Sequence, residues 1–234
     1  MVLFFDETID ASEEFIFSKE ESKHLAKVLR KKPGDSVTLT NGKGLEWEGV
    51  LTQLNPSRVA AKKIKSIQHA PPLDKLHLAI APTKNMNRME WLVEKLTELG
   101  VSSITPIICD YSERKIVKLP RLKKISIAAL KQSQQFFLPQ IHPPISFLEY
   151  LNTEIKNGYI AHCVTTDKVF LTDCNLTAQT VTLLIGPEGD FSASEIKLAE
   201  KSGLHSVSLG KQRFRTETAG LLACHTVFTQ RLKN

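Results

Sequence analysis

From residue 75 to the end of the chain, short apolar runs alternate with amphipathic segments, and this alternation limits the possible fold more than any other feature. The spacing predicts strands at residues 76–81, 104–109, 159–164, 180–185 and 207–209. It predicts helices at residues 85–99, 119–135, 146–151, 192–202 and 216–232. Because strand–helix alternation is typical of parallel sheets covered by helices, we predict an α/β domain with a mainly parallel sheet.

Residues 1–67 instead contain short β-rich runs, at positions 2–5, 14–17, 36–40, 45–54 and 58–67, separated by turn residues. One helix interrupts them, because Ser18 and Glu21 have the spacing of a capping box. Many short strands in so short a segment indicate a small β-barrel. The Ala70-Pro71-Pro72 sequence indicates a linker, since proline fits neither a ladder nor a helix interior. We therefore expect one domain at residues 1–70 and a second at 71–234.

Composition excludes several classes of protein. Hydrophobic residues make up 41% of the 234 residues, which is enough for a core and argues against intrinsic disorder. No apolar run approaches the roughly 18 residues of a membrane helix, and the N-terminus does not resemble a secretory signal. The 4 cysteines and 7 histidines lack metal-ligand spacing, so we predict free thiols, no metal and a cytoplasmic location.

Basic side chains outnumber acidic ones by 31 to 25, and the resulting net charge of +6 is compatible with a polyanionic partner. The stretch 113–131 alone holds seven basic residues against Glu113. A charge run of this kind is equally typical of the solvated face of an ordinary helix. Charge by itself therefore leaves both interpretations open.

Two glycine-bearing junctions between a predicted strand and a predicted helix are candidates for a ligand site. In the first, Ile185-Gly186-Pro187-Glu188-Gly189 follows a hydrophobic strand and precedes a helix with capping-box spacing at Ser192 and Glu195. Ligands commonly bind beyond the carboxyl ends of strands in open α/β sheets. The pattern matches neither a dinucleotide fingerprint nor a P-loop, and a simple tight turn is the alternative interpretation.

The second junction, residues 208–220, places a basic loop before a helix for which Thr216 is the expected N-cap. The helix dipole accounts for Glu217 in the first turn. It does not account for Arg215. A guanidinium beside the positive end of the helix dipole is unfavourable unless negative charge lies or develops nearby. Arg215 is therefore the strongest local indication of function.

The last predicted helix is apolar around most of its circumference. One stripe contains Leu222 and Val227, and a second contains Leu221 and Phe228. Such a helix must be covered on two sides. It either lies deep in the fold or faces the sheet on one side and a second subunit on the other, and we favour the subunit contact.

Five blocks in order resemble the RsmE-type family of SPOUT methyltransferases, which methylates N3 of a uridine in 16S ribosomal RNA. The blocks are residues 24–35, residues 88–106, Ser112-Glu113-Arg114, Ile185-Gly186-Pro187-Glu188-Gly189, and Leu209-Gly210 with residues 214–219. They cover nearly the whole chain. The chain departs from the family pattern at Asp190, where a second glycine is common, and at Lys131, where a glutamate is common. It also lacks the usual arginine near the N-terminus.

The resemblance implies a fold and a site that spacing alone did not show. The N-terminal domain would be a PUA-like RNA-binding β-barrel, and the C-terminal domain a SPOUT α/β fold whose chain end forms a trefoil knot. S-adenosylmethionine would bind among three loops, namely the two junctions and a third loop at His162. The family acts as a homodimer, which we expect to form through the C-terminal domain. The expected cofactor-binding residues are His162, Ile185, Gly186, Pro187, Glu188, Gly189, Leu209, Gly210, Phe214, Arg215 and Thr216.

The basic residues would then bind 16S rRNA or the small ribosomal subunit with a salt-sensitive affinity, because phosphate contacts release counterions. Those expected to do so are Lys23, Lys27, Arg30, Lys31, Lys32, Arg88, Arg114, Arg121, Lys123 and Lys124.

The proposed chemistry assigns roles to three side chains. Uridine N3 must lose its proton before or during attack, and negative charge then spreads onto the flanking carbonyl oxygens. We assign Arg215 to stabilise that charge. Glu217 or Glu188 would take the proton or hold Arg215, and a solvent base is a third option. Because N3 lies on the pairing edge, the base must be unpaired or flipped out.

Two other functions remain as alternatives. One is ribose 2′-O-methylation by a related SPOUT enzyme, against which the block at residues 24–35 argues. The other is a non-catalytic rRNA-binding or ribosome-assembly factor that kept the fold. Binding of S-adenosylmethionine would separate the enzyme from the assembly factor.

Overall fold

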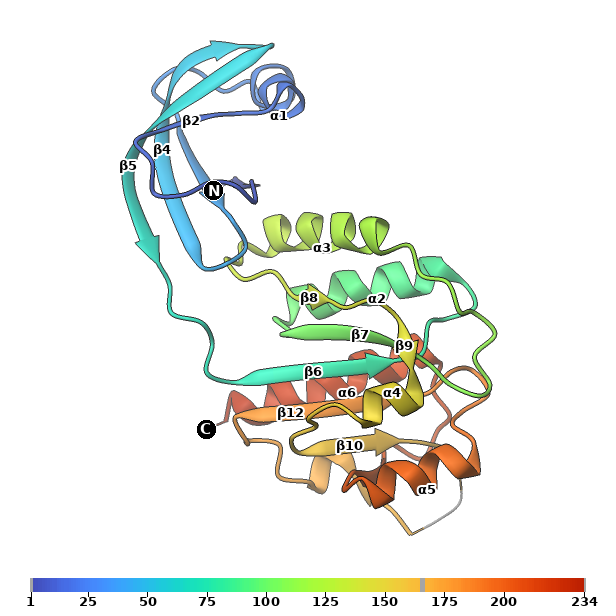
Figure 1. The fold of residues 1–234 in the computed structure, drawn as a ribbon. Helices are drawn as coiled ribbons and strands as arrows, with labels where there is room; N and C mark the ends of the chain where they lie inside the picture. The colour runs from blue at the N-terminus through green and yellow to red at the C-terminus, as the bar shows by residue number, and fades with distance from the viewer. Residues whose placement is uncertain (1, 165–166, 234) are drawn as a thin grey trace. The chain divides into compact units, whose positions relative to one another are not determined.

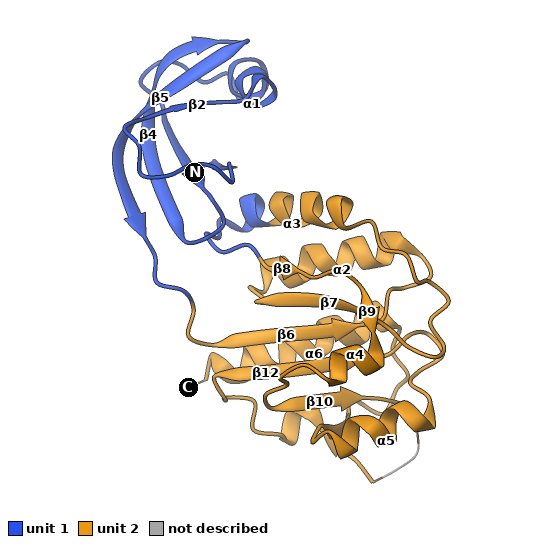
Figure 2. Cartoon of the chain, viewed as in Figure 1, with its two compact units in different colours: residues 1–71, 130–138 blue, residues 72–129, 139–234 orange. Residues whose placement is uncertain are grey.

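The computed structural model describes residues 2–164 and 167–233. The chain forms two compact units, which Figure 2 shows in different colours. The first contains residues 1–71 and 130–138, and the second contains residues 72–129 and 139–234. Residues 130–138 lie within the predicted second domain but pack with the first unit. Each unit has its own hydrophobic core.

The first unit is built on a five-stranded sheet. Its strands are β1 Leu3–Phe5, β2 Glu14–Ile16, β3 Ser36–Thr40, β4 Leu45–Asn55 and β5 Arg58–Gln68. They are ordered β1-β3-β4-β5-β2 (Figure 1), and all neighbours pair antiparallel except β1 and β3. Side chains of β4 alternate between the two faces of the sheet, as expected for a strand with one face on the core. Leu45, Trp47 and Leu51 are buried, whereas Glu46 and Glu48 between them are partly exposed.

The predicted N-cap of the first helix is confirmed. Helix α1, Lys19–Lys23, follows Ser18, whose Oγ accepts a hydrogen bond from Glu21 N at 3.2 Å. A π-helical turn, η1 His24–Val28, continues it. The Glu21 carboxylate accepts a hydrogen bond from Lys131 Nζ at 2.8 Å, which helps to hold residues 130–138 in this unit.

The second unit contains a parallel sheet of eight strands. Its strands are β6 Lys75–Ile80, β7 Ser103–Ile108, β8 Gln140–Ile141, β9 Ile145–Ser146, β10 Gly158–Ala161, β11 Val169–Phe170, β12 Thr180–Ile185 and β13 His205–Ser208. Their order is β11-β13-β10-β12-β6-β7-β8, with β9 beside β7. Every pair in the sheet is parallel, which confirms the fold class predicted from the alternation.

Helices cover both faces of this sheet (Figure 1). They are α2 Met86–Glu98, α3 Leu119–Ser133, α4 Phe147–Leu151, α5 Ala193–Lys201 and α6 Thr216–Arg231, with a 3-10 turn η2 at Leu171–Asp173. Alternate residues of β6 face opposite layers. Leu78 and Ile80 belong to the cluster that includes Leu92 of α2, whereas Ala79 belongs to the cluster that includes Phe147 of α4.

Several elements differ from their predictions in length or character. Strand β10 ends at Ala161 rather than at residue 164, and β8, β9 and β11 are two-residue strands too short to show periodicity. Thr216 is not the N-cap of the last helix, because Arg215 holds that position with extended dihedrals and Thr216 is the first helical residue.

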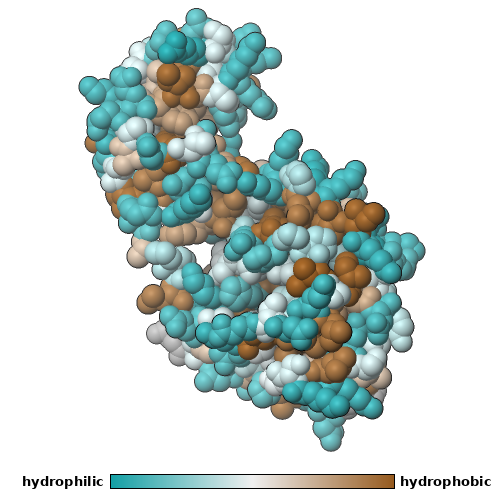
Figure 3. Space-filling view, in the orientation of Figure 1, coloured by the Kyte–Doolittle hydropathy of each residue, from teal (hydrophilic) through white to brown (hydrophobic). Residues whose placement is uncertain are grey.

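On the face drawn in Figure 3, hydrophilic side chains surround small apolar patches. No helix in residues 2–164 and 167–233 is long and apolar enough to cross a membrane. Nor does any group of three or more His, Cys, Asp and Glu side chains in those ranges have the arrangement of a metal site.

Replacement of Leu92 by alanine tests the core of the second unit. Leu92 is fully buried against the sheet, so the cavity should lower the free energy of unfolding by about 2–5 kcal/mol in urea titrations. Leu148→Ala, at a side chain that is 57% exposed, should change it by about 0.5 kcal/mol or less. Equal effects of the two substitutions would contradict this description of the core.

Candidate active site

Three neighbouring strands end at one edge of the parallel sheet. Strand β10 pairs with β12 on one side and with β13 on the other, and Ala161 lies opposite both Ile185 and Val207. Because all three strands run the same way, the loops that follow them emerge at the same edge. The second unit therefore brings together segments of the chain that are up to about 50 residues apart in sequence.

These loops line a cleft of about 1030 Å³. Every residue predicted to bind the cofactor lies on its wall: His162, Ile185, Gly186, Pro187, Glu188, Gly189, Leu209, Gly210, Phe214, Arg215 and Thr216. The two glycine-bearing junctions thus meet, as the family resemblance implies. Tyr111, Lys168 and Asp190 also line the cleft and were not predicted to do so.

The loop after β12 is shaped by close packing at its glycines. A Cβ atom on Gly189 would lie 2.9 Å from Tyr111 Cβ, and one on Gly186 would lie 3.0 Å from the Phe191 ring. Neither position has room for a larger residue, so the backbone itself forms this part of the wall. Beyond the loop, Ser192 and Glu195 form the predicted capping box and begin α5.

The loop after β13 leads into α6 through Arg215. The Phe214 ring lies about 3.2 Å from the position that a Cβ on Gly210 would occupy, so this glycine again allows a close approach. Among residues 2–164 and 167–233, no side chain caps the helix N-terminus at Arg215. The N-terminal N–H groups of α6 and the exposed Arg215 therefore bring positive potential to the edge of the cleft.

The two candidate carboxylates lie in different surroundings. Glu188 lines the cleft and is exposed, and its Oε1 accepts a hydrogen bond from Lys84 N at 2.8 Å. Glu217 does not line the cleft; it is buried, with Oε1 at 3.5 Å from Arg88 Nε of α2. Glu217 Oε2 is buried and has no hydrogen-bond partner among the described residues.

His162 is buried at the end of β10 beside Lys168. The His162 Nδ1 atom lies 3.3 Å from Lys168 Nζ, which also donates to His162 O and Val164 O, each at 2.6 Å. Burial lowers the pKa of His162 below its ordinary value of 6.5, and the nearby Lys168 lowers it further. Because the Lys168 ammonium can only donate, Nδ1 accepts this hydrogen bond and the ring proton lies on Nε2, a buried atom without a partner among the described residues.

The ten predicted RNA-binding residues divide between the two units. In the first, Lys23, Lys27, Arg30 and Lys32 are exposed, and Lys31 is partly buried. In the second, three arginines contact groups of the protein itself. Arg121 donates to both carboxylate oxygens of Glu90, which lowers the pKa of Glu90, while Arg114 donates to Lys84 O and Arg88 lies beside Glu217.

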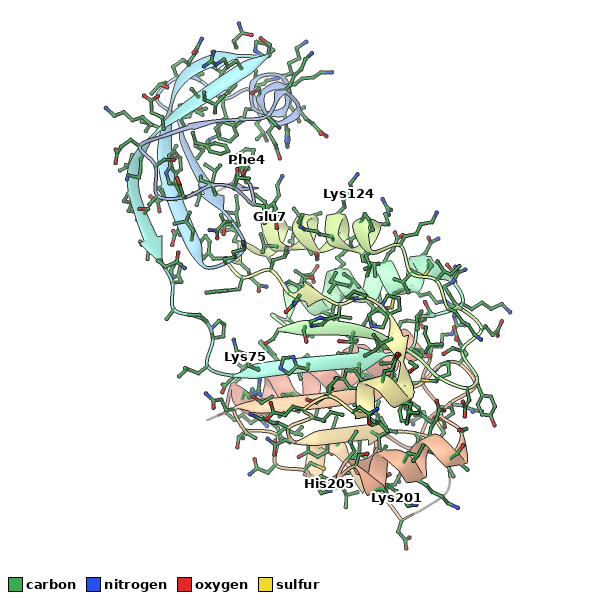
Figure 4. All side chains as sticks on the ribbon, in the orientation of Figure 1. Phe4, Glu7, Lys75, Lys124, Lys201 and His205 are labelled. Carbon is green, nitrogen blue, oxygen red and sulfur yellow. The ribbon has the colours of Figure 1, made fainter. Side chains whose placement is uncertain are left out.

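Lys123 and Lys124 are exposed on α3, and Figure 4 shows Lys124 extending away from this helix. Within the second unit, Lys124 is therefore better placed to reach a large anionic partner than the three arginines are.

A pH titration of stability tests the description of His162. Because the pKa of His162 is lowered in the folded protein, the unfolded chain binds more protons than the folded protein does as the pH falls through about 6.5. The free energy of unfolding should therefore decrease as the pH falls. Burial lowers the pKa of His77 too, so part of the decline has a second source. His162→Gln should reduce the decline between about pH 7.5 and pH 5. An unchanged decline in His162→Gln would contradict this description.

Comparison with known proteins agrees with this geometry. Residues 69–228 match the family model of the RNA methyltransferase domain, and residues 17–64 match that of the RNA methyltransferase PUA domain. Ribosomal RNA small subunit methyltransferase E of Synechocystis is 32% identical over 211 residues, covering 86% of this chain and 68% of the relative. The enzyme of the same name from Rickettsia conorii is 27% identical over 84% of this chain and 81% of the relative.

Two solved structures share the fold over almost the entire chain. A probable rRNA-methyltransferase from Porphyromonas gingivalis is 35% identical with a TM-score of 0.92, covering 100% of this chain and 99% of that one. The small subunit methyltransferase E of Neisseria gonorrhoeae, solved bound to S-adenosyl methionine, is 29% identical with a TM-score of 0.85, covering 98% of each chain. The chain therefore belongs to the RsmE family of ribosomal RNA small subunit methyltransferases, with a PUA-like β-sheet domain followed by a parallel-sheet methyltransferase domain.

Proposed function

We propose that this protein transfers a methyl group from S-adenosylmethionine to N3 of a uridine in 16S rRNA of the small ribosomal subunit. The observation that carries the proposal is the meeting of three loops at one cleft beside Arg215. The relative from Neisseria gonorrhoeae, which binds S-adenosyl methionine, supports the cofactor. The names of the curated relatives support the substrate.

The residues of the cleft fit a cofactor of this kind. Gly186 and Gly189 lie on the cleft wall and pack so closely on Phe191 and Tyr111 that a side chain at either position would displace the loop. His162 lies on the same wall. When bound, S-adenosylmethionine supplies an electrophilic methyl group on a sulfonium.

Arg215 stabilises the negative charge that develops on the uracil carbonyl oxygens when N3 loses its proton. It is exposed, lines the cleft and stands at the N-terminus of α6, so the charge of its guanidinium adds to the dipole of the helix. Such preorganised positive potential lowers the barrier without any reorganisation during the reaction.

Glu188 accepts the N3 proton in this proposal, because it is the candidate carboxylate that lines the cleft. Its hydrogen bond to Lys84 N engages Oε1 and leaves Oε2 as the acceptor. Glu217 instead holds Arg88, since it is buried away from the cleft lining and lies 3.5 Å from Arg88 Nε.

We assign the RNA contacts to exposed basic side chains of both domains. We place these domains at residues 1–70 and 71–234. Lys23, Lys27, Arg30 and Lys32 in the first and Lys123 and Lys124 in the second are exposed. Phosphate groups would bind these side chains and position a flipped uridine. The substrate is cytoplasmic, and so is the proposed site of action.

We also propose that the chain end forms a trefoil knot. The path of the chain through β13 and α6 supports the knot. Strand β13 pairs with β10 on the side opposite β12, and α6 then returns to pack against β6, β12 and α2. The family resemblance of the loops at this edge supports the same path.

The same helix supports a homodimer. Helix α6 buries Ala223, Cys224 and Val227 within its own unit, while Leu222 is partly exposed and Phe228 is 37% exposed. A helix that is apolar on a second side, beyond the side packed in its own unit, needs a further covering surface, which a second subunit would supply.

Arg215→Ala tests the proposed chemistry. The substitution should lower the rate of methyl transfer to small-subunit RNA by about 100-fold or more, measured with labelled S-adenosylmethionine, and leave thermal stability intact. Lys201→Ala removes the same charge from the exposed end of α5 (Figure 4) and should retain full activity. A fully active Arg215→Ala protein would rule out the assigned role.

Phe228→Glu tests the dimer. Sedimentation should show the wild-type chain as a dimer and the variant as a monomer, because a buried unpaired carboxylate is costly at an interface. Leu198→Glu, at a side chain on α5 that is 41% exposed, is the matched control and should remain dimeric. A wild-type chain that sediments as a monomer at all concentrations would refute this interface.

A further inference from the structure

Asp190 has a backbone conformation that is unusual for its residue type. Its φ is +69°, in the left-handed region, although the residue is not glycine. Such a conformation is uncommon outside glycine, and asparagine and aspartate tolerate it because their short side chains form local hydrogen bonds. A glycine would adopt the same backbone conformation without strain, so the carboxylate needs an explanation of its own.

The Asp190 carboxylate joins two of the three loops that line the cleft. Its Oδ1 accepts a hydrogen bond from Phe191 N at 2.8 Å, within the loop after β12. Its Oδ2 accepts a hydrogen bond from Cys163 N at 2.7 Å, in the loop after β10. The ladder between these strands ends at Ala161 and Ile185. Asp190 therefore continues the connection into the loops, where the strands no longer pair.

The peptide unit between His162 and Cys163 is held from both ends. Its N–H donates to the Asp190 carboxylate, and its carbonyl oxygen, His162 O, accepts a hydrogen bond from Lys168 Nζ at 2.6 Å. Both contacts involve a charged group, and charge-assisted hydrogen bonds are shorter and about twice as strong as neutral ones. The orientation of this peptide unit, which belongs to the wall of the cleft, is thus determined by an anion on one side and a cation on the other.

We propose that Asp190 is a positioning residue that sets the affinity of the cleft for its cofactor by holding the His162–Cys163 peptide unit in place. The proposal rests on the proposed function of the cleft. A wall that is already ordered before binding spares the ligand the entropy of ordering it, so its loss weakens binding. At saturating cofactor the wall is ordered by the ligand, so the maximal rate depends little on Asp190.

Asp190→Gly separates this role from a structural one. Glycine relieves the left-handed strain and so offsets part of the stability lost with the two hydrogen bonds, and the variant should still unfold in one cooperative transition at a slightly lower melting temperature. Both hydrogen bonds are lost, so the dissociation constant for S-adenosylmethionine, measured by calorimetry on the full chain, should rise about tenfold. The KM for the cofactor should rise in parallel while kcat changes little.

Binding of S-adenosylhomocysteine, which lacks the sulfonium charge, should weaken by the same factor, because the effect acts through the wall and not through charge. Asp190→Asn keeps one acceptor oxygen and should fall between the wild type and Asp190→Gly.

Asn157→Gly is the matched control. Asn157 also has a positive φ, of +44°, and its Nδ2 donates to Thr180 O at 2.7 Å, next to the opposite end of β10. This variant should bind S-adenosylmethionine as the wild type does. Wild-type affinity in Asp190→Gly, a loss confined to the charged cofactor, or an equal loss in Asn157→Gly would each overturn the positioning role. Failure of the wild-type chain itself to bind the cofactor would instead refute the proposed function, and this inference with it.

Discussion

The parallel pairing of β10 with both β12 and β13 is the constraint on which the rest of the site depends. It places the carboxyl ends of three strands side by side, so that loops from distant parts of the sequence leave the sheet at one edge. An antiparallel neighbour at either position would send its loop to the opposite edge. The apolar residues that make these strands buried, such as Ile160, Leu184 and Val207, therefore act on function through the direction of the chain.

Hydrogen bonds from side chains to the backbone then give the loops their shape. Both main-chain groups of Lys84 are held by charged side chains: its N–H donates to Glu188, and its C=O accepts a hydrogen bond from Arg114. The N–H at Cys163 and the carbonyl at His162 are held in the same way by Asp190 and Lys168. In both places charged side chains hold main-chain groups of the loops. A small number of ionic side chains therefore controls the orientation of the loop backbone.

Local sequence patterns predicted the parts of this structure that depend on local interactions. The alternation of strands and helices, the N-caps at Ser18 and Ser192, and the two glycine-bearing junctions all follow from residues within one or two turns of each other. The remaining features depend on contacts between distant positions. The bond between Asp190 and Cys163 spans 27 residues, and the proximity of Glu217 to Arg88 joins α6 to α2. Periodicity carries no information on such pairs, and His162 was found through the family resemblance alone.

The boundary at residues 130–138 was not predicted for the same reason. Hydrogen bonds between distant positions, such as that from Leu138 N to Gly42 O, hold these residues in the first unit.

Delivery of a methyl group to one uridine is the central step of the proposed function. The most direct test of this step is mass mapping of 16S rRNA from cells that lack this protein. The proposed function predicts that a single uridine in the small-subunit RNA loses a methyl group at N3, and that the gene restored in such cells returns it. An RNA whose uridines carry the same methyl groups with and without the protein would contradict the account.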